Sequence, residues 1–139
     1  MTGMQTILIV EDDPAVRDGI AALLERAGRE LILCSDVESA QLVAEQNALA
    51  CVITDMRLSG PFRYEGLDFI AAIKRSMGDG PIIGMTGSRA EGLEREALAR
   101  GATVVLEKPF TIEELEAYLP PLADSDGASS IVHVPGIDE

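Results

Sequence analysis

The chain has 139 residues, 47% of them hydrophobic and only 4% aromatic, which predicts one domain with a core of aliphatic side chains. Its formal net charge of −13, from 24 acidic and 11 basic residues, argues against direct nucleic-acid binding, which needs clustered Lys and Arg. No apolar stretch reaches the ~20 residues of a membrane helix and the N-terminal MTGMQT lacks signal-peptide features, so we expect a cytoplasmic protein without membrane insertion.

Five short apolar runs alternate with five amphipathic segments along the chain. The apolar runs predict β-strands at residues 6–10, 31–34, 51–54, 82–85 and 103–106. The segments between them predict helices at residues 14–27, 37–46, 67–76 and 90–100, and a last helix from 111 or 112 that stops at Pro120-Pro121. Strands that are apolar throughout are typical of a parallel sheet covered on both faces, so the pattern predicts an α/β fold with three layers.

Capping residues support two of these helices. Asp13 followed by Pro14 is a typical helix start, with an N-cap side chain and a proline in the first turn. Gly28 is expected to mark the end of the same helix. Thr111, followed three residues later by Glu114, predicts a capping box at the start of the last helix.

The composition changes at residue 124, where the polar and glycine-rich DSDGASS begins. We therefore expect one domain over residues 1–123 and a flexible C-terminal tail over residues 124–139. Docking of the β-branched run at residues 131–134 on a sheet edge is an alternative, but a disordered end is the favoured prediction. Cys34 and Cys51 lie in apolar runs, so both are expected to be buried, reduced thiols.

Polar residues with reactive or charged groups follow four of the predicted strands. Glu11 and Asp12 follow the first strand, Asp55 the third, Thr86 the fourth and Lys108 the fifth. Because the carboxyl ends of parallel strands meet at one edge of a doubly wound sheet, we expect these side chains to share a pocket. The sequence thus predicts an acidic pocket with one cation and one hydroxyl.

Adjacent carboxylates after a buried strand repel each other unless a cation or water solvates them. A hard divalent ion such as Mg²⁺, which prefers oxygen ligands, suits Glu11 and Asp12, whereas Asp13 is assigned to the helix start. A lone aspartate at a strand end is more often a turn residue. Asp55 is a candidate site residue because it is expected to share the pocket with the other polar residues. Such a pocket suits phosphoryl transfer onto a carboxylate.

Four segments together resemble the receiver domain of two-component response regulators. They are ILIVEDDPAVR, VITDMRLSG, IIGMTGS and LEKPF, in the order and with the approximate spacing of that family, and the resemblance covers about residues 4–119. It implies a flavodoxin-like fold, a doubly wound five-stranded parallel sheet in the order 2-1-3-4-5.

The resemblance also implies a role for each acidic residue. It makes Asp55 the phosphoacceptor in a Mg²⁺-dependent reaction. Asp12 and Asp55 would bind the Mg²⁺ directly, Glu11 mostly through water, and the backbone carbonyl of Arg57 would be a further ligand. Thr86 would donate a hydrogen bond to the phosphoryl group and Lys108 would form an ion pair with it. The Lys108-Pro109 peptide bond is expected to be cis.

The function implied is signalling rather than turnover of an external substrate. A histidine kinase or a histidine phosphotransfer protein would phosphorylate Asp55, and a downstream output protein would read the result. The chain would be no enzyme in the usual sense, although it can catalyse its own phosphorylation and dephosphorylation. The alternative is an aspartyl-phosphate hydrolase of a small metabolite, a class that typically has a second aspartate where Arg57 stands. A binding module that no longer accepts phosphate is a further alternative, which the intact set of pocket residues argues against.

Three features depart from the family pattern. Val105 stands three residues before Lys108, where many receivers have Tyr or Phe, so the common aromatic switch is not expected. Ser59 replaces a usual proline, and the loop at residues 60–66 is about three residues longer than usual. This loop is interpreted as a tolerated insertion or a partner contact. The last helix is expected to be short, and His133, the only histidine, has no assigned role.

Overall fold

The computed structural model describes residues 4–56, 65–87, 91–122 and 128–136. Six strands and five helices are present in this part of the chain. In order they are β1 (Gln5–Val10), α1 (Pro14–Leu24), β2 (Arg29–Cys34), α2 (Val37–Gln46), β3 (Cys51–Asp55), α3 (Glu65–Met77), β4 (Ile82–Thr86), α4 (Glu91–Arg100), β5 (Val104–Glu107), α5 (Ile112–Glu116) and β6 (Ser130–Val134). The ten predicted elements are confirmed in this order.

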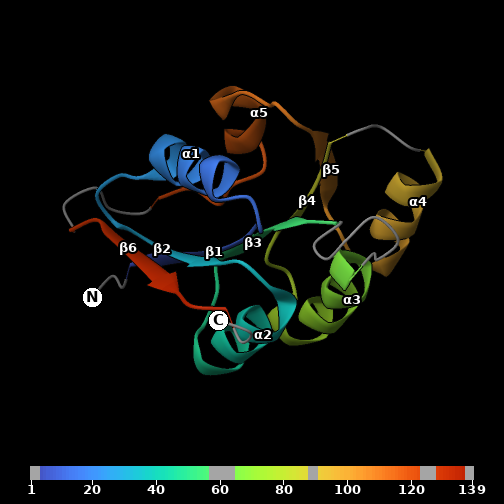
Figure 1. Cartoon of the computed structure of the whole chain (residues 1–139), viewed down its shortest axis with the longest axis horizontal. Coiled ribbons are helices and arrows are strands. Elements are labelled where there is room, and N and C mark those ends of the chain that lie inside the picture. Colours follow the sequence, from blue (N-terminus) through green and yellow to red (C-terminus); the bar gives the residue numbers. More distant parts are fainter. Residues whose placement is uncertain (1–3, 57–64, 88–90, 123–127, 137–139) are drawn as a thin grey trace.

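The strands form one parallel sheet in the order β5-β4-β3-β1-β2-β6. α1 and α5 cover one face of the sheet, and α2, α3 and α4 cover the other (Figure 1). The predicted three-layer α/β architecture is therefore confirmed. The carboxyl ends of all six strands lie at the same edge, because every pairing is parallel.

The predicted five-stranded sheet is wrong in one respect, because a sixth strand extends it. β6 pairs in parallel with β2, from Glu30 opposite Ser130 to Cys34 opposite Val134. It lies in the C-terminal tail, where a disordered end was the favoured prediction and docking on a sheet edge was the alternative; the alternative is the one that the structure shows. The order of the first five strands, 2-1-3-4-5, agrees with the prediction. Residues 124–127 and 137–139 of the predicted flexible tail lie outside the described residues.

Two hydrogen bonds hold the chain between α5 and β6 at the amino edge of the sheet. The Gln5 side-chain amide donates a hydrogen bond to the carbonyl of Pro120 (3.0 Å), and the backbone N–H of Gly28 donates to the carbonyl of Ala128 (3.2 Å). Within β6, Ile131 and Val134 pack against the hydrophobic clusters on opposite faces of the sheet. The strand therefore covers the backbone edge of β2 and partly buries two β-branched side chains.

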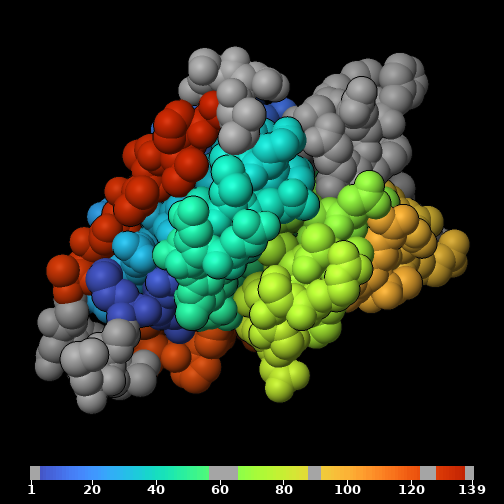
Figure 2. Space-filling view, turned by 90° about the horizontal axis from the view of Figure 1, so that it is seen from below, coloured from blue at the N-terminus to red at the C-terminus, as the bar shows by residue number. Residues whose placement is uncertain are grey.

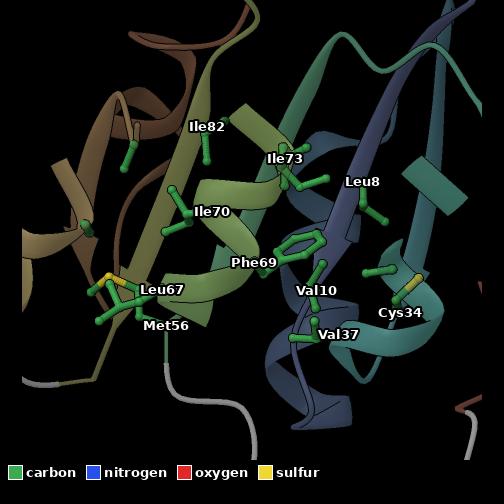
Figure 3. Close-up of a cluster of buried hydrophobic side chains, with 14 of the residues drawn as sticks. Leu8, Val10, Cys34, Val37, Met56, Leu67, Phe69, Ile70, Ile73 and Ile82 are labelled. Carbon is green, nitrogen blue, oxygen red and sulfur yellow. The ribbon is translucent and has the colours of Figure 1, made fainter. Parts of the chain in front are cut away.

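Side chains alternate across the sheet and form two hydrophobic clusters. In β1, Leu8 and Val10 pack into the cluster under α2, α3 and α4, whereas Ile7 and Ile9 pack into the cluster under α1 and α5. Figure 2 shows α2, α3 and α4 side by side over the first cluster, with β6 along the flank of the molecule. Phe69 of α3 is fully buried at the centre of that cluster (Figure 3).

The ends of α1 and α5 test the capping predictions. The Asp13 carboxylate accepts hydrogen bonds from the first-turn N–H groups of α1, as predicted. α1 ends at Leu24, three residues before the predicted end, because Glu25 adopts an extended conformation. Gly28 lies in the following turn with φ 88°, a backbone conformation that favours glycine. The capping box of Thr111 and Glu114 is confirmed, and α5 is short.

Cys34 and Cys51 are both buried and free, as predicted, and they lie in opposite hydrophobic clusters. Burial raises the pKa of the Cys34 thiol to about 11 and that of Cys51 to about 12, so both stay protonated at neutral pH. No helix in the described part of the chain has the length and apolarity needed to cross a bilayer.

Candidate functional site

Three carboxylates meet at the carboxyl edge of the sheet. Oxygen atoms of Glu11, Asp12 and Asp55 all lie within 4.8 Å of one another. Glu11 directly follows β1 and Asp55 ends β3, which is the neighbour of β1 in the sheet. Glu11 is 1% exposed and Asp55 is 6% exposed, whereas Asp12 is open to solvent. The structure therefore brings together the three acids that the sequence predicted to share a pocket.

The position of Glu11 is fixed by three backbone contacts. Its N–H donates to the carbonyl of Cys34 (3.0 Å), which continues the β1–β2 ladder by one residue. Its side chain accepts from the N–H of Asp13 (3.1 Å), and its carbonyl accepts from the Arg17 guanidinium (3.1 Å). Arg17 thus ties α1 to the end of β1. Asp13 faces its own helix as a cap, which confirms the role predicted for it.

Lys108 reaches across the sheet edge and joins two of the acids. Its ammonium Nζ lies 2.8 Å from Asp55 Oδ2 and 2.9 Å from Glu11 Oε1. The Lys108 side chain is 21% exposed, so these ion pairs are partly shielded from solvent. The backbone N–H of Lys108 donates to the carbonyl of Thr86 (2.8 Å), and the Lys108-Pro109 bond is cis, as predicted. The predicted pairing of Lys108 with a carboxylate is therefore present.

Burial and charge shift the pKa values of this pair. Burial raises the pKa of Glu11 to about 7, with a further rise from the Asp55 charge, although the Lys108 hydrogen bond opposes it. Burial lowers the pKa of Lys108, but its hydrogen bonds with Asp55 and Glu11 outweigh this and leave that pKa above its usual value. The electrostatic strain predicted for the adjacent Glu11 and Asp12 is therefore present at the buried Glu11.

Thr86 ends β4 at the same edge of the sheet. β4 pairs with β3, where Met85 lies opposite Asp55, and with β5, where Thr86 lies opposite Glu107. Thr86 is half-buried, and exposed Gly87 follows it. The strand order therefore brings Thr86 to the predicted edge. The Arg57 carbonyl, Ser59 and all but the last two residues of the loop at 60–66 lie outside the described residues.

Val105 is 6% exposed and belongs to the cluster under α2, α3 and α4. A Cβ atom on Gly84 would lie 3.4 Å from Val105 Cγ2 and 3.3 Å from the sulfur of Met56, the residue after Asp55. Val105 therefore packs in the interior near Met56. The absence of the common aromatic switch stays a prediction.

Gly66 is a site residue that the sequence reasoning did not single out. A Cβ atom at this position would lie 2.5 Å from the Cα of Met56 and would also collide with the backbone carbonyl of Asp55. The first turn of α3 thus packs directly on the backbone that carries Asp55. The sequence offered little signal for this contact, because Gly66 was predicted to lie in the loop before the helix at residues 67–76, where glycine is common.

The acidic residues fit a divalent cation. Ligand oxygens around Mg²⁺ or Ca²⁺ lie about 2.0–2.6 Å from the metal, so two ligands on one ion are separated by up to about 5 Å. The oxygens of Glu11, Asp12 and Asp55 are within this span. When ionised, the three carboxylates and Lys108 carry −3 and +1, a net −2 that one divalent ion neutralises.

Comparison with known proteins places this arrangement in a family. Residues 7–120 match the response regulator receiver domain. The chain is 32% identical over 119 residues to the transcriptional regulatory protein FixJ of Bradyrhizobium diazoefficiens, covering 86% of this chain and 57% of FixJ. It therefore spans about half the length of that relative.

Solved structures agree with this assignment. The chemotaxis protein CheY4 of Vibrio cholerae is similar with a TM-score of 0.72 and 27% identity, covering 84% of this chain and all of CheY4. A Burkholderia pseudomallei response regulator, crystallised with a phosphorylated aspartic acid, calcium ion and citrate, has the same fold with a TM-score of 0.75 and 24% identity, over 84% of this chain and 66% of its own. The chain belongs to the response regulator receiver domain family.

Proposed function

We propose that the chain is a phosphoacceptor of a two-component or phosphorelay system, and that Asp55 is the residue phosphorylated. The observation that carries this proposal is the Lys108 ammonium, held 2.8 Å from Asp55 within a cluster of three carboxylates. The donor would be the phosphohistidine of a histidine kinase or histidine phosphotransfer protein. We further propose the cytoplasm as its compartment, in keeping with two free, buried cysteines.

In the proposed reaction a carboxylate oxygen of Asp55 attacks the phosphorus of the phosphohistidine. The new O–P bond forms as the N–P bond to the imidazole breaks, and the imidazole keeps the electron pair of that bond. Lys108 holds Asp55 in place before transfer and can then pair with the phosphoryl oxygens. Thr86 would donate a hydrogen bond to the phosphoryl group from the neighbouring strand end.

We propose that Glu11, Asp12, Asp55 and the backbone carbonyl of Arg57 hold Mg²⁺, with Glu11 bound mostly through water. When bound, this ion would neutralise charge on the phosphoryl oxygens. The calcium ion in the Burkholderia structure supports a divalent ion here but does not specify which. The output is proposed to be a protein partner. The hydrolase alternative is not favoured, because the family match is to receivers.

Phosphorylation with acetyl phosphate and Mg²⁺ tests the proposal. We expect the protein to gain one acid-stable, hydroxylamine-labile phosphoryl group, measured by intact mass spectrometry. Asp55→Asn should abolish the gain. Asp13→Asn is the matched control, because it changes a nearby carboxylate that caps α1 and asparagine also caps helices. Equal uptake by wild type and Asp55→Asn would refute the assignment of Asp55.

A further inference from the structure

The sixth strand forms one edge of the sheet, and it differs from the opposite edge strand in charge and exposure. β6 has β2 on one side and, among the described residues, no strand on the other. β5, the opposite edge strand, ends in the charged Glu107 and has its two central residues buried. β6 contains no Asp, Glu, Lys or Arg, and its central Val132 is 40% exposed. An uncharged edge with an exposed β-branched residue is a template for pairing with another strand.

We propose that β6 is the interface through which a second copy of this chain binds, by antiparallel pairing of the two β6 strands. A twofold axis perpendicular to the sheet would join the two six-stranded sheets into one continuous sheet. The pairing is isologous, so each β6 edge is paired with the other and the assembly closes at two copies. A strand of a different protein that paired with β6 would not form this twofold-symmetric assembly.

The hydrogen-bond pattern allows few registers for this pairing. In an antiparallel pair, two residues directly opposite each other are either both hydrogen-bonded across the pair or both not, and this state alternates along each strand. Two identical edges can therefore match only if a residue lies directly opposite the same residue of the second copy, with the axis midway between the two. Within Ser130–Val134, the axis that pairs all five residues lies midway between the two Val132 residues.

This register specifies every opposing pair. Val132 faces Val132 of the second copy, Ile131 faces His133, and Ser130 faces Val134. All these pairs are uncharged, and the central one is a pair of β-branched side chains, which favours cross-strand packing. The side chain of Val132 lies on the same sheet face as Val134, which packs against the cluster under α2, α3 and α4.

The net charge of the chain opposes self-association, and an uncharged strand is the kind of surface that adds least to this repulsion. Two copies with a formal charge of −13 each repel one another, and contact through an uncharged strand adds no further like-charge pair at the interface. Added salt screens the remaining repulsion, so dimerisation should strengthen as salt rises. An interface held by ion pairs would weaken instead. Five residues per copy bury little area, so we expect a weak dimer with a micromolar or weaker Kd.

Disulfide trapping at Val132 tests the register. The full chain with Val132→Cys should form a covalent dimer on mild oxidation, because the two sulfurs face each other across the axis. His133→Cys is the matched control: it lies on the same exposed strand but faces Ile131 of the second copy, so it should cross-link several-fold less. The native cysteines are buried in both variants and do not compete.

Analytical ultracentrifugation of the unmodified chain, from low micromolar to near-millimolar concentration, tests the association itself. We expect a monomer–dimer equilibrium that shifts toward dimer with added salt. Val132→Lys should raise the Kd by roughly tenfold or more, because it places two like charges directly opposite each other. Its circular dichroism should match wild type, since Val132 is 40% exposed. A monomer at every concentration, or equal cross-linking of Val132→Cys and His133→Cys, would overturn the proposal.

Discussion

Replacing Glu11 with Gln should stabilise the metal-free protein at neutral and higher pH and leave its stability nearly unchanged in acid. Glu11 is 1% exposed, and burial raises its pKa from 4.5 to about 7. An acid with a raised pKa in the folded state destabilises the fold once it must ionise. Glutamine has nearly the same shape as the protonated acid and never ionises, so the variant avoids this cost.

The size of the effect follows from the pKa shift. Between pH 4.5 and about 7 the folded state holds a proton on Glu11 that the unfolded chain has released, so stability falls as pH rises through this window. Each pKa unit corresponds to about 1.4 kcal/mol, which gives a loss of about 3 kcal/mol that is complete above pH ~7. The attraction of Lys108 is already included in the shifted pKa. Glu11→Gln should therefore exceed wild type by about 3 kcal/mol at pH ~8.

Urea denaturation in the presence of a chelator measures this difference. The free energies of unfolding of wild type and Glu11→Gln are compared at pH values from about 4.5 to about 8 by circular dichroism. Using the difference between the two proteins cancels the titration of the carboxylates that do not interact with Glu11. Mg²⁺ should reduce the advantage of the variant, because a bound cation favours the ionised Glu11.

A difference that stays constant over this pH range would refute the reasoning. It would mean that Glu11 ionises as easily in the folded protein as in the unfolded chain. A strongly destabilised variant at pH ~8 without metal would contradict it more sharply, because the Lys108–Glu11 ion pair would then be a net support of the fold.

Three further substitutions test other parts of the site and the core. Lys108→Ala should still accept phosphoryl groups, but beryllofluoride should no longer shift the NMR signals of residues 86–105; wild-type shifts there would contradict this. Gly66→Ala should slow phosphoryl uptake by roughly tenfold or more, because its Cβ displaces the backbone of the acceptor, and unchanged kinetics would exclude that contact. Phe69→Ala should cost about 3–5 kcal/mol in urea denaturation, against less than about 0.5 kcal/mol for Leu42→Ala, which is 48% exposed; similar costs would place Phe69 outside the core.

The first five strands and the five helices were predictable because each has a local signal. β1 and β3 are short runs of aliphatic residues, and α1 and α5 start at capping residues that the sequence shows directly. β6 has only a weaker local signal, the β-branched run at residues 131–134. Its five residues follow a polar stretch and become a strand only through pairing with β2, about a hundred residues earlier. Contacts over such distances are not encoded in local periodicity.

The members of the candidate site were predictable from their positions at strand ends, but their interactions were not. Order along the chain placed Glu11, Asp55 and Lys108 at one edge. The bridge between the two acids forms because the Lys108 side chain reaches past the end of β4, which separates β5 from β3 in the sheet. The sequence assigned the electrostatic strain to Glu11 and Asp12 as neighbours. The fold buries Glu11, and this burial is the largest cause of its raised pKa.

Locating the phosphoryl group on the chain tests the central claim most directly. The protein is phosphorylated with acetyl phosphate in Mg²⁺ or in chelator, the acyl phosphate is reduced with borohydride, and the modified residue is identified by peptide mass spectrometry. The account predicts one modified residue, Asp55, in the sample with Mg²⁺ and little or no modification in chelator. Modification at Asp12 or Glu11, or equal modification of Asp55 in Mg²⁺ and in chelator, would contradict it.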